Sequence, residues 1–495
     1  MKQGLMYIAY LSLSFLFTIS LLQHVTPTPE RGDAHQNARM GYNLAKYGVI
    51  SYTAEQGEPI TPTMRREPFP IAAIAAFILL HPSLSTELSR DEITAGSAVQ
   101  QLKQLNIVWV FILFLGITAL CQALFKPVLL SIAIAILLIA AIWLTFASFR
   151  VDRMLTELPA AALLVWTSWL LLRFTRRPTK LGALSVGVAF GLLTLTKASF
   201  LYVCPVAIVI LMLMLRTTAS SISARGAWLR LPLLTGLVFA AICSLWIGRN
   251  AYHFGVYDLA ERGGDNLYFR QLFTEQPVLG VVYAFSPPDY RDWWGKVSGY
   301  RPEDLELGGR LAALGKGEGS IDRVRWDIYK NRMQEAGIKY EGKTKAQKWL
   351  ANEALKNFFS EPHKYALWAG VFMYRGSFQF PDALARNNWP IWAQRMFQNV
   401  SPLLYLNFLV CGVVSILRGS PLRAVFLLPI GLSLFYAMFS VNHMRFNEPV
   451  IPFIWLAGAI TLGLILQWLL KKFGSGEWWW GAAMRQPVRS VQPDF

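Results

Sequence analysis

The sequence predicts an all-helical protein that crosses a membrane many times, and three observations support this prediction. Hydrophobic residues make up 54% of the 495 residues and charged residues only 16%, whereas soluble domains carry about 45–50% apolar and about 25% charged residues. The apolar residues form blocks of about 20, the length that an α-helix needs to cross the hydrocarbon core of a bilayer. Basic residues gather in the short segments between these blocks, as they do in polytopic membrane proteins. An ordinary soluble enzyme and a disordered chain are therefore excluded.

The net charge and the positions of the cysteines exclude further classes of protein. The formal net charge is +17, from 47 lysines and arginines against 30 acidic residues. A soluble protein of this charge would be expected to bind nucleic acid. Here the basic residues flank apolar blocks, so we expect a lipid bilayer as the partner and no nucleic acid. All 4 cysteines lie inside apolar blocks, so neither a disulfide framework nor a zinc ribbon is predicted.

Ten apolar blocks are interpreted as membrane-spanning helices. They cover residues 5–23, 104–124, 128–148, 157–173, 181–197, 200–215, 229–248, 399–417, 421–440 and 449–470. No small-residue cleavage site follows the first block, so we expect a retained anchor and not a cleaved signal peptide.

The basic residues between the blocks set the orientation. Four clusters lie at 173–180, 216–230, 418–423 and 471–472. Ten spans with a cytoplasmic N-terminus place all four clusters on the cytoplasmic side, in agreement with the positive-inside rule. An error of one span would scatter the clusters to both sides of the membrane.

Two further apolar stretches would break this charge pattern if either crossed alone. Residues 69–80 are about a dozen, a length typical of interfacial or re-entrant helices. Residues 363–380 carry Lys364 and Arg375 among many aromatic residues, as an interfacial helix does. Both stretches are therefore expected to be juxtamembrane helices.

This topology divides the chain into a catalytic module, an insertion and a C-terminal part. The predicted parts are a transmembrane module 1–248 with outer loops 24–103 and 149–156, an extracytoplasmic α-rich subdomain 249–398, C-terminal transmembrane helices 399–472 and a cytoplasmic tail 473–495. Gly-rich turns and a helical pattern near 320–360 indicate that the insertion is folded.

Four acidic residues at the ends of outer loops are candidates for chemistry. They are Asp33 after the first span, Glu67 in PTMRREPFP, Asp152 in the second outer loop and Glu157 at the start of the fourth span. Ionisable residues at the edge of a span are functional candidates when they face the inside of a bundle. The alternative is structural: the loop charges are solvated, and Glu157 stabilises its helix through the helix dipole.

Six basic residues are expected on the same outer face. They are Arg65, Arg66, Lys197, Arg249, His443 and Arg445. Each alone could be an interfacial residue whose charged end reaches water. Together with the carboxylates, they predict an outer-face cavity that suits an anionic, phosphate-bearing lipid.

In these features the chain resembles the GT-C superfamily of glycosyltransferases, most closely the bacterial branch related to protein O-mannosyltransferases and the lipid A aminoarabinose transferase. The features are Asp33 after the first span, PTMRREPFP, MLTELP, LLTLTKASFLY and HMRFNEPVIPFIWLAG, in this order along the membrane part. The segment 249–398 matches no family that we can name. The resemblance implies a GT-C-like fold and a transferase of the bacterial cytoplasmic (inner) membrane that uses a polyprenyl-phosphate sugar.

The resemblance also implies roles for individual residues. Asp33 matches the acid of the first outer loop that is the catalytic base in such families. Glu157 matches best, and Asp152 next, the acid of the following outer loop that supports this base. Arg66, with Arg65 near it, matches the basic residue that approaches the donor phosphate.

Two departures from the family pattern leave questions open. The aminoarabinose transferase pattern has Glu-Lys-Pro where this chain has Arg66-Glu67-Pro68, so the role of Glu67 is open. The first loop has one acid after the glycine where protein O-mannosyltransferases have an Asp-Glu pair, which weakens the case for a protein acceptor.

The predicted reaction transfers a sugar from a lipid monophosphate to an acceptor hydroxyl on the outer face of the membrane. Asp33 would accept the hydroxyl proton, and a one-step displacement would invert the anomeric centre. The phosphomonoester leaves as a stable anion, so it needs cations and no general acid. The candidate cations are Lys197, Arg445 and Arg66, with Arg249 a weaker one.

The sequence requires no cofactor for this reaction. Nucleotide sugars are not expected as donors, because there is neither a cytoplasmic globular domain nor a phosphate-cradling glycine loop. A divalent metal stays open, although Asp33 and Glu157 alone are too few ligands for a dedicated site.

Three other functions fit parts of the pattern. A transporter or lipid flippase fits the many spans and the charges within the membrane, but the halves show no repeat and the charges gather on the outer face. An O-antigen ligase or polymerase would use a diphosphate-linked glycan, and its main cationic loop would be expected late in the chain. A scaffold that only displays the segment 249–398 leaves the charges at the loop–span junctions without a role.

Overall fold

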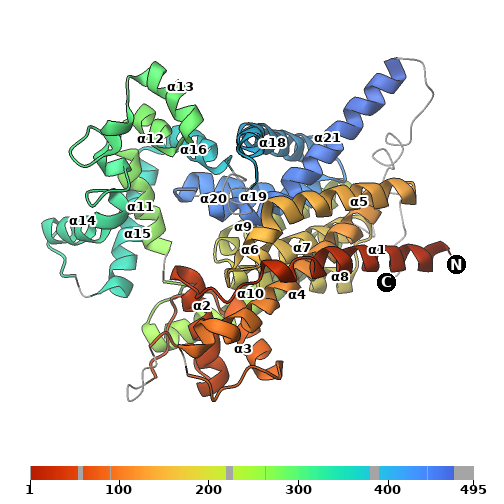
Figure 1. Cartoon of the computed structure of the whole chain (residues 1–495), viewed down its shortest axis with the longest axis horizontal. Helices are drawn as coiled ribbons and strands as arrows, with labels where there is room; N and C mark the ends of the chain where they lie inside the picture. Colours follow the sequence, from red (N-terminus) through yellow and green to blue (C-terminus); the bar gives the residue numbers. More distant parts are fainter. Residues whose placement is uncertain are drawn as a thin grey trace. The chain divides into compact units, whose positions relative to one another are not determined.

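The computed structural model describes residues 2–53, 60–89, 91–218, 227–261, 263–340, 342–378, 389–442 and 444–472. Within these ranges the chain is helical and contains no β-strand. The helices form two compact units (Figure 1). The first unit comprises Met1–Leu259, Gln379–Leu432 and Glu448–Phe495, and the second comprises Ala260–Phe378 and Ser433–Asn447. The predicted cytoplasmic tail 473–495 lies outside the described residues.

The helices of the first unit include those that overlap predicted spans and two in the predicted first outer loop. They are α1 (Lys2–Ile19), α2 (Gly32–Tyr47), α3 (Pro68–Leu80), α4 (Gly96–Leu124), α5 (Val128–Ile142), α6 (Ser148–Arg150), α7 (Glu157–Arg176), α8 (Lys180–Thr196), α9 (Phe200–Thr218), α10 (Ala227–Phe254), α18 (Ile391–Leu417) and α21 (Ile451–Lys472). A π-helical turn, Trp143–Ala147, joins α5 to α6. The predicted span 421–440 falls on α19 (Arg423–Phe439), which begins in the first unit.

Seven helices in the described ranges are long and apolar enough to cross a membrane. They are Tyr7–His24, Gly96–Leu124, Val128–Arg150, Glu157–Arg176, Trp228–Phe254, Ile391–Leu417 and Arg445–Leu469. The other three predicted spans fall on the shorter apolar helices Lys180–Thr196, Phe200–Arg216 and Arg423–Phe439. The all-helical polytopic membrane class is therefore confirmed, and the count of ten spans stays a prediction.

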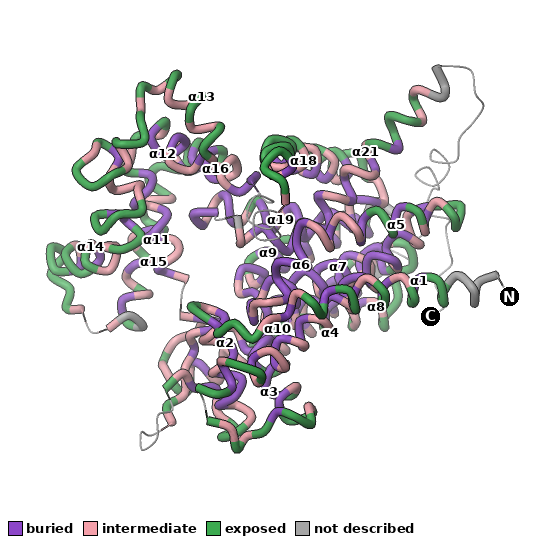
Figure 2. The backbone as a smooth tube through the Cα atoms, viewed as in Figure 1, coloured by how far each residue is buried: buried purple, intermediate pink, exposed green. Residues whose placement is uncertain are grey.

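The burial pattern of these helices suits a bundle that is surrounded by lipid. In α7, 72% of the spanning window is buried inside the protein, against 28% in α10 and 28% in α18. Figure 2 shows the same contrast between buried and exposed stretches of the helices. The exposed faces carry large apolar side chains, such as Leu129 at 79% and Leu245 at 78% exposure. Lipid tails solvate such side chains, which would be unfavourable in water.

Two short helices carry the first outer loop of the prediction. α2 and α3 pack side by side (Figure 1), and Ala38 of α2 shares a buried core cluster with Ile74 of α3. α3 begins at Pro68, because a proline suits the first position of a helix, where its missing N–H is not needed. The helices predicted near 34–47 and over 69–80 are therefore confirmed as helices.

The close approach of α2 and α3 depends on Gly41. A Cβ atom at Gly41 would lie 2.2 Å from Cγ2 and 2.6 Å from Cβ of Ile74, and the branched Ile74 side chain has few other rotamers. We therefore expect Gly41→Ala to destabilise the folded protein by about 1–3 kcal/mol, measured as unfolding in detergent. Gly248→Ala is the matched control, because nothing lies within 4 Å of a Cβ at Gly248. Equal effects of the two substitutions would contradict the packing argument.

The second unit is all-helical as well. Its helices are α11 (Gly263–Thr274), α12 (Val278–Phe285), α13 (Pro288–Ser298), α14 (Ile321–Glu335), α15 (Lys343–Ser360), α16 (Pro362–Gly376) and α20 (Met444–Asn447). The core is largely aromatic, with Tyr268, Tyr329, Trp368 and Phe372 all buried. The main segment of this unit, Ala260–Phe378, is shorter than the predicted subdomain 249–398. The unit also includes Ser433–Asn447.

Candidate functional site

The segment that precedes α3 contacts the predicted base. Asp33 lies in the first turn of α2, and the guanidinium of Arg66 forms an ion pair with its carboxylate. The same guanidinium donates to Oε1 of Gln36, at 3.1 Å from Nε and 2.8 Å from Nη2. The Arg66 side chain is 8% exposed and that of Asp33 is 24% exposed. Arg66 therefore holds Asp33 in place from the buried side, and the carboxylate keeps access to its surroundings.

Glu67 connects this pair to the end of α8. Its Oε1 accepts a hydrogen bond from the backbone N–H of Ala198 at 3.4 Å. The neighbouring Lys197 forms an ion pair with Glu157, with 3.9 Å between Nζ and Oε1. Both partners of that pair are almost fully buried, with side-chain exposures of 7% and 2%. Charges this deeply buried persist in a folded protein when they are paired.

Two ion pairs and one hydrogen bond relate five of the predicted site residues. Asp33 pairs with Arg66 and Lys197 pairs with Glu157, while the hydrogen bond joins Glu67, the chain neighbour of Arg66, to the backbone of Ala198, the chain neighbour of Lys197. We call these five residues the acid–base group. Its three carboxylates outnumber its two cations, so it needs further positive charge to favour a phosphate. Like charges so close together would otherwise repel an incoming anion.

Two more predicted cations lie against the same segment. Nη1 of Arg249 donates to the backbone carbonyl of Thr63 at 2.9 Å and to Oδ1 of Asn250 at 2.9 Å. The guanidinium of Arg65 lies 5.0 Å from the ring centroid of Tyr52. With these two arginines, positive charge exceeds negative charge around residues 63–67. This balance suits a bound phosphate.

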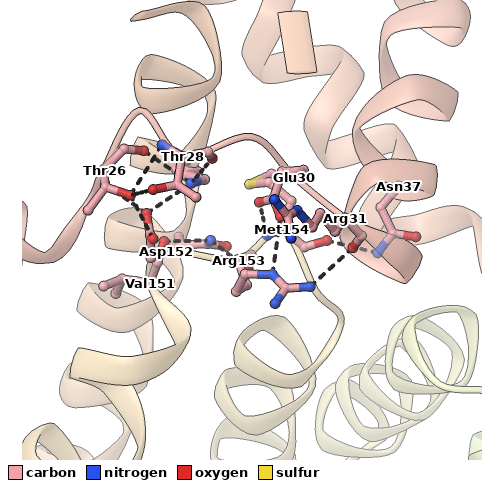
Figure 3. Close-up of polar contacts among 11 residues, drawn as sticks. Thr26, Thr28, Glu30, Arg31, Asn37, Val151, Asp152, Arg153 and Met154 are labelled. Atoms are coloured by element: carbon pink, nitrogen blue, oxygen red, sulfur yellow. Dashed lines mark hydrogen bonds and ion pairs between the residues drawn. The ribbon is translucent and has the colours of Figure 1, made fainter. Parts of the chain in front are cut away.

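Asp152 has a different environment from the acid–base group. Its two carboxylate oxygens accept from the backbone N–H of Thr26 at 2.7 Å and from the Thr26 hydroxyl at 2.8 Å. Nζ of the buried Lys103 lies 2.9 Å from the same carboxylate. Figure 3 shows these contacts where the first and second outer loops meet. Asp152 therefore joins two loops, and both of its oxygens are engaged.

For two predicted cations no contact with this group is described. Arg445 lies on α20 in the second unit. His443 lies outside the described residues. Their roles toward a donor phosphate stay predictions.

Two ionic contacts of the first unit involve no residue that was predicted for the site. The Glu30 carboxylate accepts from the Met154 N–H at 2.7 Å and from Nε of Arg153 at 3.2 Å. Arg150 pairs with Glu448, with 2.5 Å between Nε and Oε2. In the sequence, the only indication of the first contact is Glu30 itself, an acid three residues before Asp33. The only indication of the second is Glu448, in the segment Asn447-Glu448-Pro449.

Burial raises the pKa of Glu30 above its ordinary value, and the Met154 N–H and the nearby cations only partly oppose this shift. Between the ordinary and the raised value, the folded protein binds this proton more tightly than the unfolded chain. The contribution to stability is therefore complete below the ordinary pKa and is lost as the pH rises through the raised pKa. Glu30→Gln, which does not titrate, should flatten the dependence of the unfolding temperature on pH above about pH 4. An unchanged slope would contradict this assignment.

No metal site is evident in the described part of the chain. No group of three or more His, Cys, Asp or Glu side chains that could hold a metal ion occurs there. The acid–base group supplies carboxylates, but each described contact of these carboxylates is with a cation or an N–H group.

The fold and these contacts define a multi-pass membrane protein with paired charges at its loop–helix junctions. No protein-family model and no curated protein matches the sequence. Among solved structures, the chain is similar to the archaeal oligosaccharyltransferase AglB from Archaeoglobus fulgidus in complex with an inhibitory peptide and a dolichol-phosphate. The TM-score is 0.46 and the identity 13%, over 96% of this chain and 53% of that one.

Other structures of the same enzyme give similar values. The complex with Zn and sulfate has a TM-score of 0.46 and 11% identity, over 94% of this chain and 49% of that one. The apo form has a TM-score of 0.45 and 11% identity, over 97% and 55%. The chain thus spans about half the length of these structures.

Proposed function

We propose that this protein is a membrane glycosyltransferase of the GT-C kind. It moves a sugar from a polyprenyl-phosphate donor to an acceptor hydroxyl on the outer face of the bacterial cytoplasmic membrane, with inversion of the anomeric centre. The acid–base group supports this proposal, because it links a partly exposed carboxylate to buried cations through a short series of contacts.

In the proposed reaction, Asp33 accepts the proton of the acceptor hydroxyl as its oxygen attacks the anomeric carbon. The bond between that carbon and the phosphate oxygen breaks, and the phosphomonoester leaves with the electron pair. Arg66 fixes the position of the Asp33 carboxylate through their ion pair. A positioned base of this kind contributes about 10²–10⁴-fold to the rate.

The leaving phosphate is stabilised by cations that the protein has already oriented. We assign this role to Lys197, with Arg66, Arg65 and Arg249 around it. Preorganised charges stabilise developing negative charge without reorganising during the reaction. Glu157 orients Lys197 through their buried ion pair. We favour Glu157 over Asp152 as the supporting acid, because both oxygens of Asp152 already accept hydrogen bonds from Thr26.

The proposed donor is a lipid phosphate that carries a sugar. The AglB structure contains a dolichol-phosphate and an inhibitory peptide. A polyprenyl-phosphate sugar is a lipid phosphate of the same chemical kind as the first of these. For this chain we propose a hydroxyl acceptor. The experiment below also tests peptides as acceptors and diphosphate-linked glycans as donors.

The decisive experiment is incubation of purified protein in detergent with a panel of polyprenyl-phosphate sugars and diphosphate-linked glycans as donors. Lipid, glycan and protein acceptors are added, and mass spectrometry follows every fraction. Consumption of one donor with sugar appearing on a hydroxyl acceptor supports the proposal. Turnover only with diphosphate-linked donors would overturn the donor class, and no turnover with any donor would favour a transporter.

Lys197→Met should raise the KM for the donor more than the control substitution Asp91→Asn does. Asp91 lies in a loop, and its side chain is 80% exposed.

A further inference from the structure

Asp33 and Glu157, the two proposed acids, follow the first and the second predicted outer loop. These two loops donate hydrogen bonds to each other (Figure 3). Asp152 of the second loop accepts the backbone N–H of Thr26 in the first loop, at 2.7 Å. Glu30 of the first loop accepts the backbone N–H of Met154 in the second loop, also at 2.7 Å. Each loop therefore supplies one carboxylate and one N–H group to the other.

Each carboxylate of this exchange is also paired with a cation. Nζ of Lys103 lies 2.9 Å from Asp152, and it donates to the Thr26 and Thr28 carbonyls at 3.1 and 2.8 Å. Arg153 lies 3.2 Å from Glu30, and its Nη2 donates to the Arg31 carbonyl at 3.1 Å. Carboxylates that accept such charge-assisted bonds are held more firmly than those with neutral donors.

Two buried asparagines complete the contact. Nδ2 of Asn37, on α2, donates to the Met154 carbonyl at 2.9 Å. Nδ2 of Asn106, on α4, donates to the Val151 and Arg153 carbonyls, each at 3.0 Å. Both asparagines are 2% exposed. The second loop is thus fixed by its own backbone groups as well as by its side chains, which leaves it little freedom to shift.

The spacing relates this exchange to the proposed acids. Asp33 follows Glu30 by three residues, and Glu157 follows Met154 by three residues. Glu30 therefore joins the backbone immediately before α2 to the backbone immediately before α7. Its side chain is 0% exposed, so this position is unsuited to contact with a substrate.

We infer that Glu30 is a positioning residue, which sets the separation of Asp33 and Glu157 by holding the start of α2 against the start of α7. The catalytic part of this inference rests on the proposed function. The structural part rests on the hydrogen bonds alone. Displacements of about 1 Å at a reacting group can lower turnover by about 10²-fold. A positioning role therefore predicts a loss in kcat with little change in KM.

The test compares Glu30→Ala, Glu30→Gln and the control Asp91→Asn in the full-length protein. Glutamine keeps an oxygen that accepts the Met154 N–H, and alanine does not. Hydrogen–deuterium exchange of the segment 150–157 should be about tenfold faster in Glu30→Ala than in the wild type. It should be close to wild type in Glu30→Gln and in the control.

The kinetic arm uses the donor that the wild type consumes. Glu30→Ala should lower kcat by about 10–100-fold with the donor KM nearly unchanged, and Glu30→Gln should restore most of the activity. If Glu30→Ala does not fold, Arg153→Met replaces it, because this variant removes only the cation and leaves the carboxylate on Met154. That variant should lower kcat about threefold to tenfold.

The outcomes separate the two proposals. Unchanged exchange in Glu30→Ala overturns the contact itself, and where Arg153→Met replaces that variant, an unchanged kcat in Arg153→Met overturns the positioning role. Faster exchange with unchanged kcat overturns the positioning role and leaves a purely structural one. A wild type that is inactive with every donor overturns the proposed function, while the exchange measurement still tests the contact.

Discussion

Asp33→Asn is expected to abolish nearly all sugar transfer while the protein still folds and binds donor lipid. Asparagine has almost the same shape as aspartate and can still accept a hydrogen bond from Arg66, but it cannot take a proton from an acceptor hydroxyl. The expected loss in kcat is about 10²–10⁴-fold, the usual contribution of a general base. Asp33 is more accessible to a substrate than Glu157, because its side chain is 24% exposed and that of Glu157 only 2%.

Single-turnover transfer and donor binding, measured on the same preparation, separate chemistry from recognition. Donor affinity should stay near the wild-type value in Asp33→Asn, and Asp91→Asn should behave as wild type in both measurements. Wild-type turnover in Asp33→Asn would remove Asp33 as the base, and a collapse of donor affinity with normal single-turnover chemistry would reassign it to binding.

Helices could be predicted from the sequence because hydrophobic length is a local property. The block 104–124 lies within α4, and the block 449–470 overlaps α21 with a shift of two residues at each end. The pairing of Asp33 with Arg66 follows partly from the sequence as well, since PTMRREPFP places the arginine just before a proline-initiated helix. Spacing alone could not show which acid that arginine contacts.

Contacts between distant segments could not be predicted in this way. Glu30 contacts a backbone N–H that lies 124 positions later, and no periodicity marks such a partner. The role of Asp152 is a similar case: the sequence shows an acid in a loop, but not that Thr26 and Lys103 occupy its oxygens. Carboxylates that accept backbone N–H groups resemble catalytic acids in sequence, and geometry alone distinguishes them.

The other large effect is expected at the buried ion pair between Arg150 and Glu448. Both oxygens of Glu448 contact the Arg150 guanidinium, and the two residues are 8% and 7% exposed. The pair joins α6 to the 3₁₀ turn that precedes α21, across 298 positions of sequence. Removing one partner of such a pair leaves a buried charge without its counter-charge, which costs about 3–5 kcal/mol.

Arg150→Met should therefore lower the free energy of unfolding by about 3–5 kcal/mol, measured in mixed micelles with SDS as the denaturant. The matched control is Arg332→Met, which breaks an equally bidentate pair with Glu275 whose side chains are 32% and 37% exposed. Exposed pairs contribute about 0–1 kcal/mol, so the control should have a small effect.

The double variant Arg150→Met with Glu448→Leu distinguishes a lost interaction from an uncompensated charge. If the cost arises from the buried carboxylate, removing it as well should restore much of the stability, since apolar residues of similar volume often replace a buried ion pair without loss. The cost of the double variant should then be well below the sum of the two single costs. Additive costs would mean that each side chain stabilises the fold through contacts of its own, such as that of Arg150 with the Phe149 ring at 4.1 Å, and not through the pair.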